Sequence, residues 1–370
     1  MRIAYLNSIC QKYDAISNAI SEEIGWLRAA GHEVRLFAYA CEFDDVPATI
    51  VDNEAQIVLD PFFQTCDLAV FHFGVYYPLF NVLPAVPRKA HRIVVFHNIT
   101  PKHVLPAASH ALIDKSFVQM ANIAFADHVV CDSHTNKAVL REAGINVPAT
   151  VLPLAVHTDL TAPPAKPSFD DGVVRIAFVG RLVQSKAPLD MLAAAQALLV
   201  AHGRLRLQVD LVANLGFSDP AVIQAVRDQL AQLGHRFGQR FTGQLHGNAP
   251  EAVKMRVLTD ADLFVLPTHH EGFCVPILES LASGCRVICY DNSNTPAVAG
   301  GLGTLVPTGD VAALCAAVDH DATLVRSEAW RKSGYAQAVQ ASQAHLCDFA
   351  VDTVRMRFLA LIRQQGAHRN

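Results

Sequence analysis

The sequence has little charge and no long basic run. Only 17% of its 370 residues are charged, and the formal net charge is −4. Proteins that bind duplex nucleic acid displace its counterions with clustered lysine and arginine side chains. Because this sequence has no such cluster, no nucleic acid is expected as a partner. The start, Met1–Asn7, lacks the long apolar segment of a signal peptide or membrane span. These absences predict a globular protein of the cytoplasm.

Cysteines with metal-binding spacing are also scarce. The nine cysteines are odd in number and scattered, and Cys131, Cys285 and Cys289 lie in or beside apolar runs, where cysteine behaves as a small hydrophobe. Cys285 and Cys289 have no second ligand pair nearby, and the Asp-x-Asp sequences at 260–262 and 319–321 fit element boundaries better than metal ligands. We therefore expect reduced thiols and no metal site.

The glycine-rich turn of dinucleotide-binding enzymes is missing too. Neither Asn7–Tyr13 nor Gly180–Ala187 contains the Gly-x-Gly-x-x-Gly pattern after a strand. A nicotinamide-dependent dehydrogenase is discounted for this reason, and no cofactor is expected.

What the sequence does contain is an alternation of short apolar runs with longer segments of helical period. The expected strands are 2–6, 33–39, 68–72, 92–96, 128–131, 173–179, 205–211, 240–242, 263–266 and 286–290, and the expected helices are 15–30, 111–124, 135–143, 188–200, 220–233 and 276–283. Such an alternation predicts an α/β fold with parallel sheets, which bind ligands beyond the carboxyl ends of their strands.

The length favours two domains of ordinary size. Three prolines and two aspartates between Thr161 and Gly172 indicate a linker there. We expect a Rossmann-like domain at 1–160, a linker at 161–172, a second Rossmann-like domain at 173–345 and a C-terminal helix at 346–370 that packs back on the first domain. In that last segment an apolar stripe is expected at Leu346, Phe349, Ala350, Thr353, Met356 and Leu359. Two doubly wound domains would leave a cleft between them.

One loop in the second domain is suited to anions and sugar hydroxyls. After the strand at 263–266, Gly272 lets the backbone approach a ligand closely, and a helix then begins near Pro276. The free amides of Phe273, Cys274 and Val275 would point at a bound phosphate or hydroxyl. The loop also brings two carboxylates, Glu271 and Glu279, which are expected to enter one cavity. The alternative is that Glu271 is solvated and Glu279 pairs locally.

A second loop offers cations. Gly180 and Arg181 follow the strand at 173–179, and Lys186 precedes the next helix. A guanidinium fork and a mobile ammonium suit a diphosphate, although surface cations are common after strands.

Taken together, these passages resemble family 4 glycosyltransferases, which have the two-domain GT-B fold. The matching pieces are Val-Gly-Arg with Lys at 179–186, Phe-Thr-Gly at 241–243, Glu-Gly-Phe with Glu at 271–279, and Ser-Gly-Cys at 283–285. The resemblance implies that Arg181 and Lys186 neutralise the donor diphosphate, Glu271 holds sugar hydroxyls and Glu279 binds the ribose. It also implies a donor site that includes Gly180, Gly243, Leu245 and Gly272 to Val275, with the base beside Leu245.

The first domain resembles a bacterial branch of this family that assembles surface polysaccharide. The resemblance rests on Val95 to Pro101, with His97 directly after a strand. It implies that His97, with Arg181, Lys186 and Glu271, acts in catalysis, His97 from the acceptor side. Other residues at strand ends, Tyr13, Asp14, His72, Asn98 and Thr100, are expected to shape the acceptor site. The first loop, Asn7–Tyr13, departs from the family pattern because it has no glycine pair, so Tyr13 or Asp14 would fill that space.

The resemblance predicts a retaining, metal-independent hexosyltransferase. Its donor would be a nucleotide-diphosphate sugar, GDP-mannose or a UDP-hexose first, and its acceptor a saccharide or lipid-linked saccharide, with peripheral contact at the inner membrane face. Two alternatives stay open: a GT-B nucleotide-sugar epimerase, and a non-catalytic subunit that binds sugar nucleotides.

Overall fold

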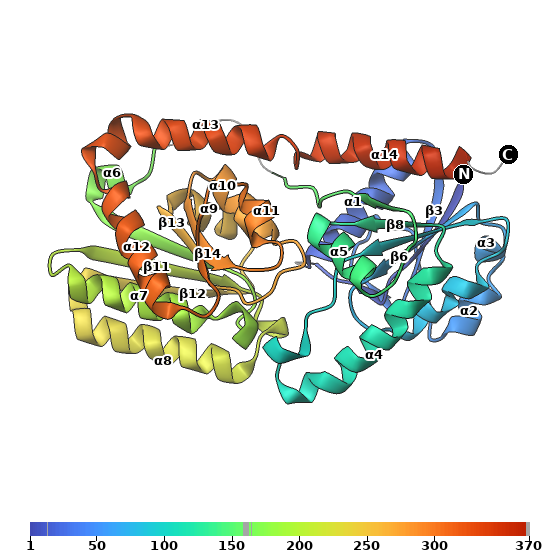
Figure 1. Cartoon of the computed structure of the whole chain (residues 1–370), viewed down its shortest axis with the longest axis horizontal. Helices are drawn as coiled ribbons and strands as arrows, with labels where there is room; N and C mark the ends of the chain where they lie inside the picture. Colours follow the sequence, from blue (N-terminus) through green and yellow to red (C-terminus); the bar gives the residue numbers. More distant parts are fainter. Residues whose placement is uncertain (13, 158–162, 164, 368–370) are drawn as a thin grey trace. The chain divides into compact units, whose positions relative to one another are not determined.

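The computed structural model describes residues 1–12, 14–157, 163 and 165–367, and these residues form two compact units. Unit 1 consists of Met1–Ala155 and Phe349–Asn370, and unit 2 of Val156–Asp348. Each unit is built on a parallel sheet flanked by helices (Figure 1). The predicted α/β class with two Rossmann-like domains is confirmed.

Unit 1 has a seven-stranded sheet in the order β5-β3-β1-β6-β7-β8-β9. Its strands are β1 (Arg2–Leu6), β3 (Glu33–Ala38), β5 (Ala48–Ile50), β6 (Leu68–Phe73), β7 (His91–Phe96), β8 (His128–Cys131) and β9 (Ala149–Val151). All six residues of β6 are buried, as expected for a central strand covered on both faces. A separate two-stranded pair consists of β2 (Ile9–Cys10), which follows β1, and β4 (Ala40–Cys41), which follows β3.

Helices cover both faces of this sheet. On one face, α1 (Ala15–Ala29) packs against α14 (Val351–Ala367), where the rings of Trp26 and Phe358 lie 5.9 Å apart. The other face carries an aromatic core in which Phe73 stacks on Phe80 at 4.3 Å. The remaining helices of unit 1 are α2 (Glu54–Val58), α3 (Pro61–Gln64), α4 (His110–Met120) and α5 (His134–Glu142).

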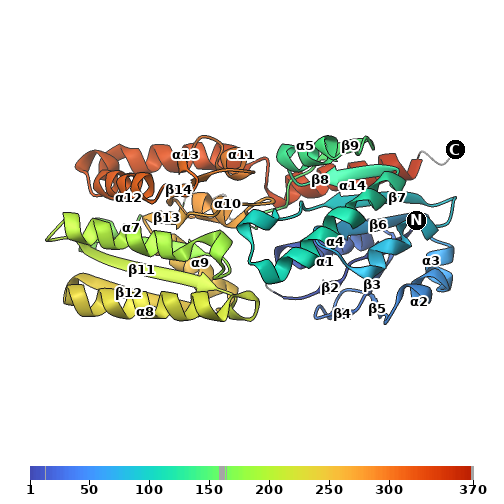
Figure 2. The same ribbon diagram turned by 60° about the horizontal axis from the view of Figure 1, so that its bottom comes forward.

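Unit 2 has a six-stranded sheet in the order β12-β11-β10-β13-β14-β15, which can be followed from β12 to β14 in Figure 2. Its strands are β10 (Val173–Val179), β11 (Arg206–Ala213), β12 (Phe241–Gly247), β13 (Leu263–Leu266), β14 (Arg286–Asp291) and β15 (Thr304–Pro307). The order reverses between β10 and β13. At such a reversal the loops after the two strands diverge, and ligands bind in the space between them.

Two layers of helices enclose the unit 2 sheet. Helices α7, α8 and α12 pack on one another, and α10 packs on α9, α11 and α13. Their bounds are α7 (Pro188–Ala201), α8 (Pro220–Phe237), α9 (Glu251–Asp260), α10 (Val275–Ala282), α11 (Thr295–Ala299), α12 (Val311–Val325) and α13 (Tyr335–Leu346). The sequence pattern did not predict α9, α12 or β15.

The segment predicted as a linker, 161–172, is packed onto unit 2 in its described part. Lys166 is buried, and its Nζ donates to Thr259 O at 2.8 Å and Ser283 O at 2.6 Å. These carbonyls lie at the ends of α9 and α10, where an ammonium group is favoured by the helix dipoles. Residues Ser168–Asp171 form a short helix, α6. The composition of residues 161–172 does not predict this packing, because the packing depends on one buried lysine and not on the prolines and aspartates that indicated a linker.

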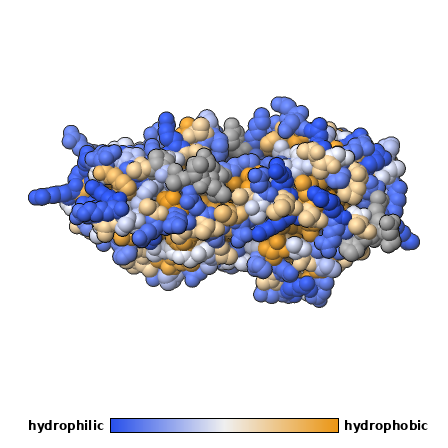
Figure 3. All heavy atoms as spheres, turned by 90° about the horizontal axis from the view of Figure 1, so that it is seen from above, coloured by the Kyte–Doolittle hydropathy of each residue, from blue (hydrophilic) through white to orange (hydrophobic). Residues whose placement is uncertain are grey.

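The apolar stripe predicted for the C-terminal segment is confirmed only in part, because Leu346 is buried and Phe349, Ala350, Thr353 and Leu359 are partly buried, but they do not lie on one helix. Leu346 ends α13, and the buried face of α14 consists of Val354, Phe358, Leu361 and Ile362, whereas Met356 is 66% exposed. The break between the two helices shifts the helical phase, so one periodic stripe does not continue across it. In the space-filling view of Figure 3, hydrophobic residues are scattered in small groups among hydrophilic ones.

Candidate donor and acceptor sites

The loops that follow β10 and β13 meet at the reversal point of unit 2. Lys186 lies in the first loop and Glu271 in the second, and the Lys186 ammonium forms an ion pair with Glu271 Oε1. The two side chains are only 17% and 8% exposed. A cation and a carboxylate that the sequence assigned to one ligand are therefore in direct contact at the carboxyl edge of the sheet.

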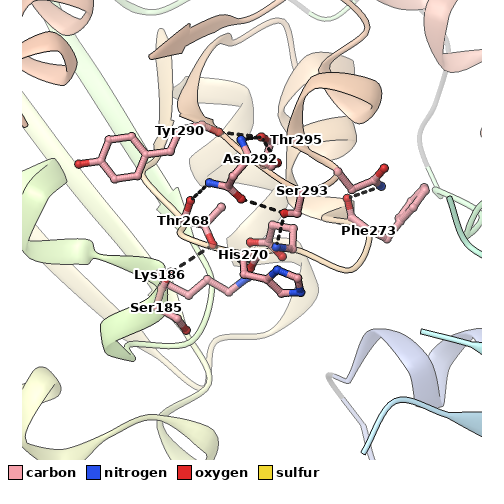
Figure 4. A network of polar contacts seen from close by, with 11 residues as sticks. Ser185, Lys186, Thr268, His270, Phe273, Tyr290, Asn292, Ser293 and Thr295 are labelled. Carbon is pink, nitrogen blue, oxygen red and sulfur yellow. Dashed lines mark hydrogen bonds and ion pairs between the residues drawn. The ribbon is translucent and has the colours of Figure 1, made fainter. Parts of the chain in front are cut away.

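Backbone and side-chain hydrogen bonds fix the loop after β13 (Figure 4). His269 N donates to Ser185 O at 2.7 Å, which ties this loop to the one after β10. On its other side, Asn292 Nδ2 donates to Thr268 O at 2.7 Å, and Glu271 N donates to Ser293 Oγ at 2.8 Å. Glu271 is thus held from both neighbouring loops.

Arg181 is the most available cation of the site. It follows Gly180 at the end of β10, is exposed, and has no side-chain hydrogen bond or ion pair with the residues that the structure describes. A guanidinium of this kind can bind an incoming anion without breaking an existing contact.

The amino end of α10 points its first amides toward the same loop. Cys274 precedes the helix with a φ of 86°, a conformation uncommon outside glycine, and within the described chain no side chain caps the helix. Phe273 and Cys274 are buried, whereas Gly272 and Val275 are partly exposed. Burial raises the pKa of the Cys274 thiol well above its usual range, so this cysteine is packed rather than reactive.

Glu279 does not share the surroundings of Glu271. Its Oε1 lies 2.7 Å from Nζ of Lys254, a residue of α9, and Lys254 also contacts Glu251 at 2.8 Å. Burial raises the pKa of Glu279, and Lys254 opposes that shift. The two carboxylates thus belong to two separate ion pairs.

The predicted base-binding residues lie on the edge strand β12. Leu245 pairs with Leu211 of β11 and is half-buried. A Cβ on Gly243 would stand 2.6 Å from Leu230 Cδ2. A glycine is therefore needed at position 243 because α8 lies closely on β12. The resemblance assigned Gly243 to the donor site, but this packing alone accounts for the glycine.

In unit 1, candidate residues gather at the carboxyl ends of β6 and β7. His72 lies in β6 and His97 directly follows β7, with His72 Nδ1 2.9 Å from His97 Nε2. Asn98 has a φ of 70° and Thr100 is half-buried beyond it. Asp14 caps α1 by accepting a hydrogen bond from Ser17 N at 2.9 Å. Tyr13 lies outside the described residues.

Sequence reasoning missed several partners of these residues. Asp132 follows β8 and accepts a hydrogen bond from His97 at 2.7 Å, Glu23 of α1 lies beside His72, and Lys254 neutralises Glu279. A polar residue directly after a buried strand is a signal that could have identified Asp132. Glu23 and Lys254 lie within helical patterns and carry no such signal.

Comparisons with known proteins agree with this geometry. Residues 174–320 match the family model described as "Glycosyl transferases group 1". These residues lie within unit 2. Over 170 residues, the chain is 30% identical to "O-antigen chain mannosyltransferase B" of Escherichia coli, and the match covers 45% of this chain and 41% of that protein. The chain thus matches less than half the length of this curated relative.

Solved structures match this chain over nearly its whole length. A glycosyltransferase from Rickettsia africae ESF-5 has a TM-score of 0.72 at 15% identity and covers 98% of each chain. A sucrose-phosphate synthase from Thermosynechococcus elongatus has a TM-score of 0.70 at 18% identity and covers 99% of each chain. The predicted GT-B fold is confirmed. Among the described helices, none is long and apolar enough to cross a membrane.

Proposed function

We propose that this protein is a retaining glycosyltransferase that transfers a hexose from a nucleotide-diphosphate sugar to a saccharide acceptor. The observation that carries the proposal is the meeting of Lys186 and Glu271 at the reversal point of a group 1 glycosyltransferase domain. Ligands of doubly wound sheets bind at that point. A diphosphate needs cations there, and a sugar needs oxygen acceptors.

In the proposed donor complex, Arg181 and Lys186 bind the diphosphate and the amino end of α10 faces it. Arg181 is exposed, and the first amides of α10 lack a side-chain cap in the described chain. Lys186 has three donors, so it can hold a phosphate oxygen and Glu271 together. Glu271 is then fixed beside the sugar, where a carboxylate accepts hydroxyl hydrogens.

Transfer would proceed on one face of the sugar. The bond from the anomeric carbon to the diphosphate breaks as the acceptor hydroxyl oxygen bonds to that carbon, and the departing phosphate oxygen takes the hydroxyl proton. Arg181, Lys186 and the α10 terminus stabilise the growing phosphate charge, so that catalysis is positioning and electrostatics. This mechanism uses no enzyme nucleophile and requires no metal.

Mannose is the sugar to test first, because the curated relative is named as a mannosyltransferase. GDP-mannose is the first donor and a UDP-hexose the second. That relative's name also refers to the O-antigen chain, which supports surface polysaccharide, free or lipid-linked, as the acceptor class. Membership of family 4 is part of the proposal.

A lipid-linked acceptor would bring the enzyme to the inner face of a membrane. In unit 1, α4 and the turn that follows it expose four apolar side chains, with Lys115 among them. They are Leu112, Phe117, Val118 and Phe125, which are 44%, 40%, 76% and 53% exposed. Apolar side chains interspersed with cations favour anionic bilayers, so peripheral contact is part of the proposal.

The test is transfer of labelled hexose from GDP-mannose or UDP-hexoses to saccharide acceptors, with and without EDTA. We expect acceptor-dependent release of the nucleotide diphosphate that EDTA does not reduce. Glu271→Gln and Lys186→Met should each lose most turnover, roughly 100-fold or more, and Lys332→Met is the control because Lys332 is 73% exposed.

Other outcomes would identify the alternatives. Conversion of the donor sugar without acceptor would indicate an epimerase. Tight donor binding without turnover across the acceptors would indicate a binding subunit.

A further inference from the structure

Five buried side chains of unit 1 form a continuous chain of polar contacts. Asp132 Oδ2 lies 2.7 Å from His97 Nδ1, and His97 Nε2 lies 2.9 Å from His72 Nδ1. His72 Nε2 lies 3.3 Å from Glu23 Oε2, which accepts a hydrogen bond from Tyr5 OH at 3.0 Å. The His72 and His97 side chains are only 1% and 4% exposed. Both nitrogens of His97 and Nδ1 of His72 therefore have hydrogen-bond partners inside the protein, whereas His72 Nε2 faces the Glu23 carboxylate at ion-pair distance without hydrogen-bond geometry.

The contacts fix how many protons the two rings hold. Asp132 is a carboxylate, which only accepts hydrogen bonds, so His97 Nδ1 carries a hydrogen. A bare lone pair on His72 Nε2, 3.3 Å from the Glu23 carboxylate oxygen, would be repelled by it, so we place a hydrogen on this nitrogen as well. The contact between the two rings needs one hydrogen more, on either His97 Nε2 or His72 Nδ1. Two neutral imidazoles have two N–H groups in total, whereas these contacts require three. One of the rings is therefore an imidazolium.

We propose that His72 and His97 share one positive charge between Asp132 and Glu23, and that His72 is a positioning residue for the loop that begins at His97. The proposal deepens the proposed function, on which it rests for the role of that loop at the acceptor side. The shared proton moves only between His72 Nδ1 and His97 Nε2, so no bond to substrate is involved.

The charges around the two rings agree with this arrangement. Burial alone would lower the pKa of His97, but Asp132 outweighs it with help from Glu23 and Asp14, and the pKa is raised. For His72, burial dominates over Glu23, the neighbouring His97 also disfavours a second charge, and the pKa is lowered. The charge resides mainly on His97, and the pair does not take up a second proton easily.

The loop held by this chain presents an unused donor. Asn98 adopts a φ of 70°, and its Oδ1 accepts a hydrogen bond from Ile99 N at 2.8 Å. Its Nδ2 is buried and has no hydrogen-bond partner in the part of the chain that the structure describes. A buried amide without a partner is costly unless a ligand supplies an acceptor. A hydroxyl oxygen of a saccharide is a suitable acceptor. By fixing the loop at His97, the polar chain would orient Asn98 Nδ2 toward that hydroxyl.

The first experiment is a long-range ¹H–¹⁵N spectrum of the full-length protein labelled with ¹⁵N-histidine, recorded at about pH 8, well above the ordinary imidazole pKa of about 6.5. We expect the signals of one imidazolium ring and one neutral ring. Each set of signals is assigned to its residue by its absence from the spectrum of His97→Gln or His72→Gln. Two neutral rings or two imidazolium rings would overturn the proposal. His91→Gln is the matched control, because His91 lies on the same strand β7 and contacts Gln365 instead.

The second experiment measures transfer kinetics against pH. Replacing His72 with Leu removes the partner of His97 Nε2, and we expect kcat to fall roughly 10- to 100-fold, as when other supporting partners are lost, with a shifted pH profile. His72→Gln, whose amide oxygen can accept from His97, should recover part of the rate. Equal rates and profiles in wild type and His72→Leu would refute the positioning role.

The two experiments separate the inference from the proposed function. If the wild-type protein transfers no hexose, the proposed function fails, and the spectrum still decides whether the two rings share a proton.

Discussion

Lys254→Met is expected to destabilise unit 2, because it leaves the buried carboxylate of Glu279 without its positively charged partner. Lys254 and Glu279 are 18% and 12% exposed in their side chains, and their charged atoms lie 2.7 Å apart. Methionine keeps most of the volume of the lysine stem and removes the ammonium. Glu279 then remains buried without its counter-charge.

The magnitude follows from the burial of the pair. Removing one partner of a buried ion pair costs about 3–5 kcal/mol, and the residual exposure here favours the lower end. For a domain of the size of unit 2, about 3 kcal/mol corresponds to a fall in Tm of roughly 6–12 °C. Scanning calorimetry should show this loss in the transition of unit 2.

The loss should depend on pH. Burial raises the pKa of Glu279, and Lys254 holds that rise back, so the variant raises the pKa further. The folded variant then binds a proton more tightly than the unfolded chain, and its stability falls as pH rises above the ordinary carboxyl pKa. The difference from wild type should be larger at pH 8 than at pH 5.

Glu251→Gln is the matched control, because Glu251 is the exposed partner of the same lysine, with 64% of its side chain accessible. An exposed pair contributes little, so Tm should change by no more than about 2 °C. If Lys254→Met changed Tm as little as Glu251→Gln, or lost more stability at pH 5 than at pH 8, the reasoning would be refuted.

Two further substitutions test the packing of the fold. Lys166→Met should lower the stability of unit 2 by about 2–4 kcal/mol, because buried carbonyls lose a charged donor, whereas Lys332→Met at the surface should leave the urea midpoint nearly unchanged. Gly300→Ala should cost more than about 1 kcal/mol, since its φ is 59° and a Cβ would stand 2.3 Å from the His345 ring; a Tm equal to wild type would contradict this. Gly25→Ala, in α1 with open space around it, should gain about 0.5–1 kcal/mol in the same scan.

The sequence predicts this fold well where a pattern is local and strongly periodic. Strands such as β1 and β13 have the predicted bounds, because a short apolar run between polar residues has few alternative structures. Helix α12 was missed although its apolar residues lie on the sheet side, since an alanine-rich segment shows a weak contrast between its faces. The C-terminal stripe was right only in part, because the break between α13 and α14 shifts the helical phase and leaves Met356 exposed.

The site was predictable to the level of loops but not of contacts. Lys186 and Glu271 are 85 residues apart in sequence, and only the position of β10 next to β13 brings them together. The pairing of Glu279 with Lys254 depends on how α9 lies against α10. The polar chain around His72 and His97 needs side chains in or directly after four strands, β1, β6, β7 and β8, and from α1, and no spacing in the sequence encodes that meeting.

The central claim is that the carboxyl edge at β10 and β13 binds the donor through Lys186 and Glu271. The most direct measurement is titration calorimetry of wild type, Lys186→Met and Glu271→Gln with a nucleoside diphosphate and with the matching nucleotide sugar. Lys186→Met should weaken both ligands roughly tenfold or more, whereas Glu271→Gln should weaken only the nucleotide sugar. Unchanged binding of both ligands in Lys186→Met would contradict the account.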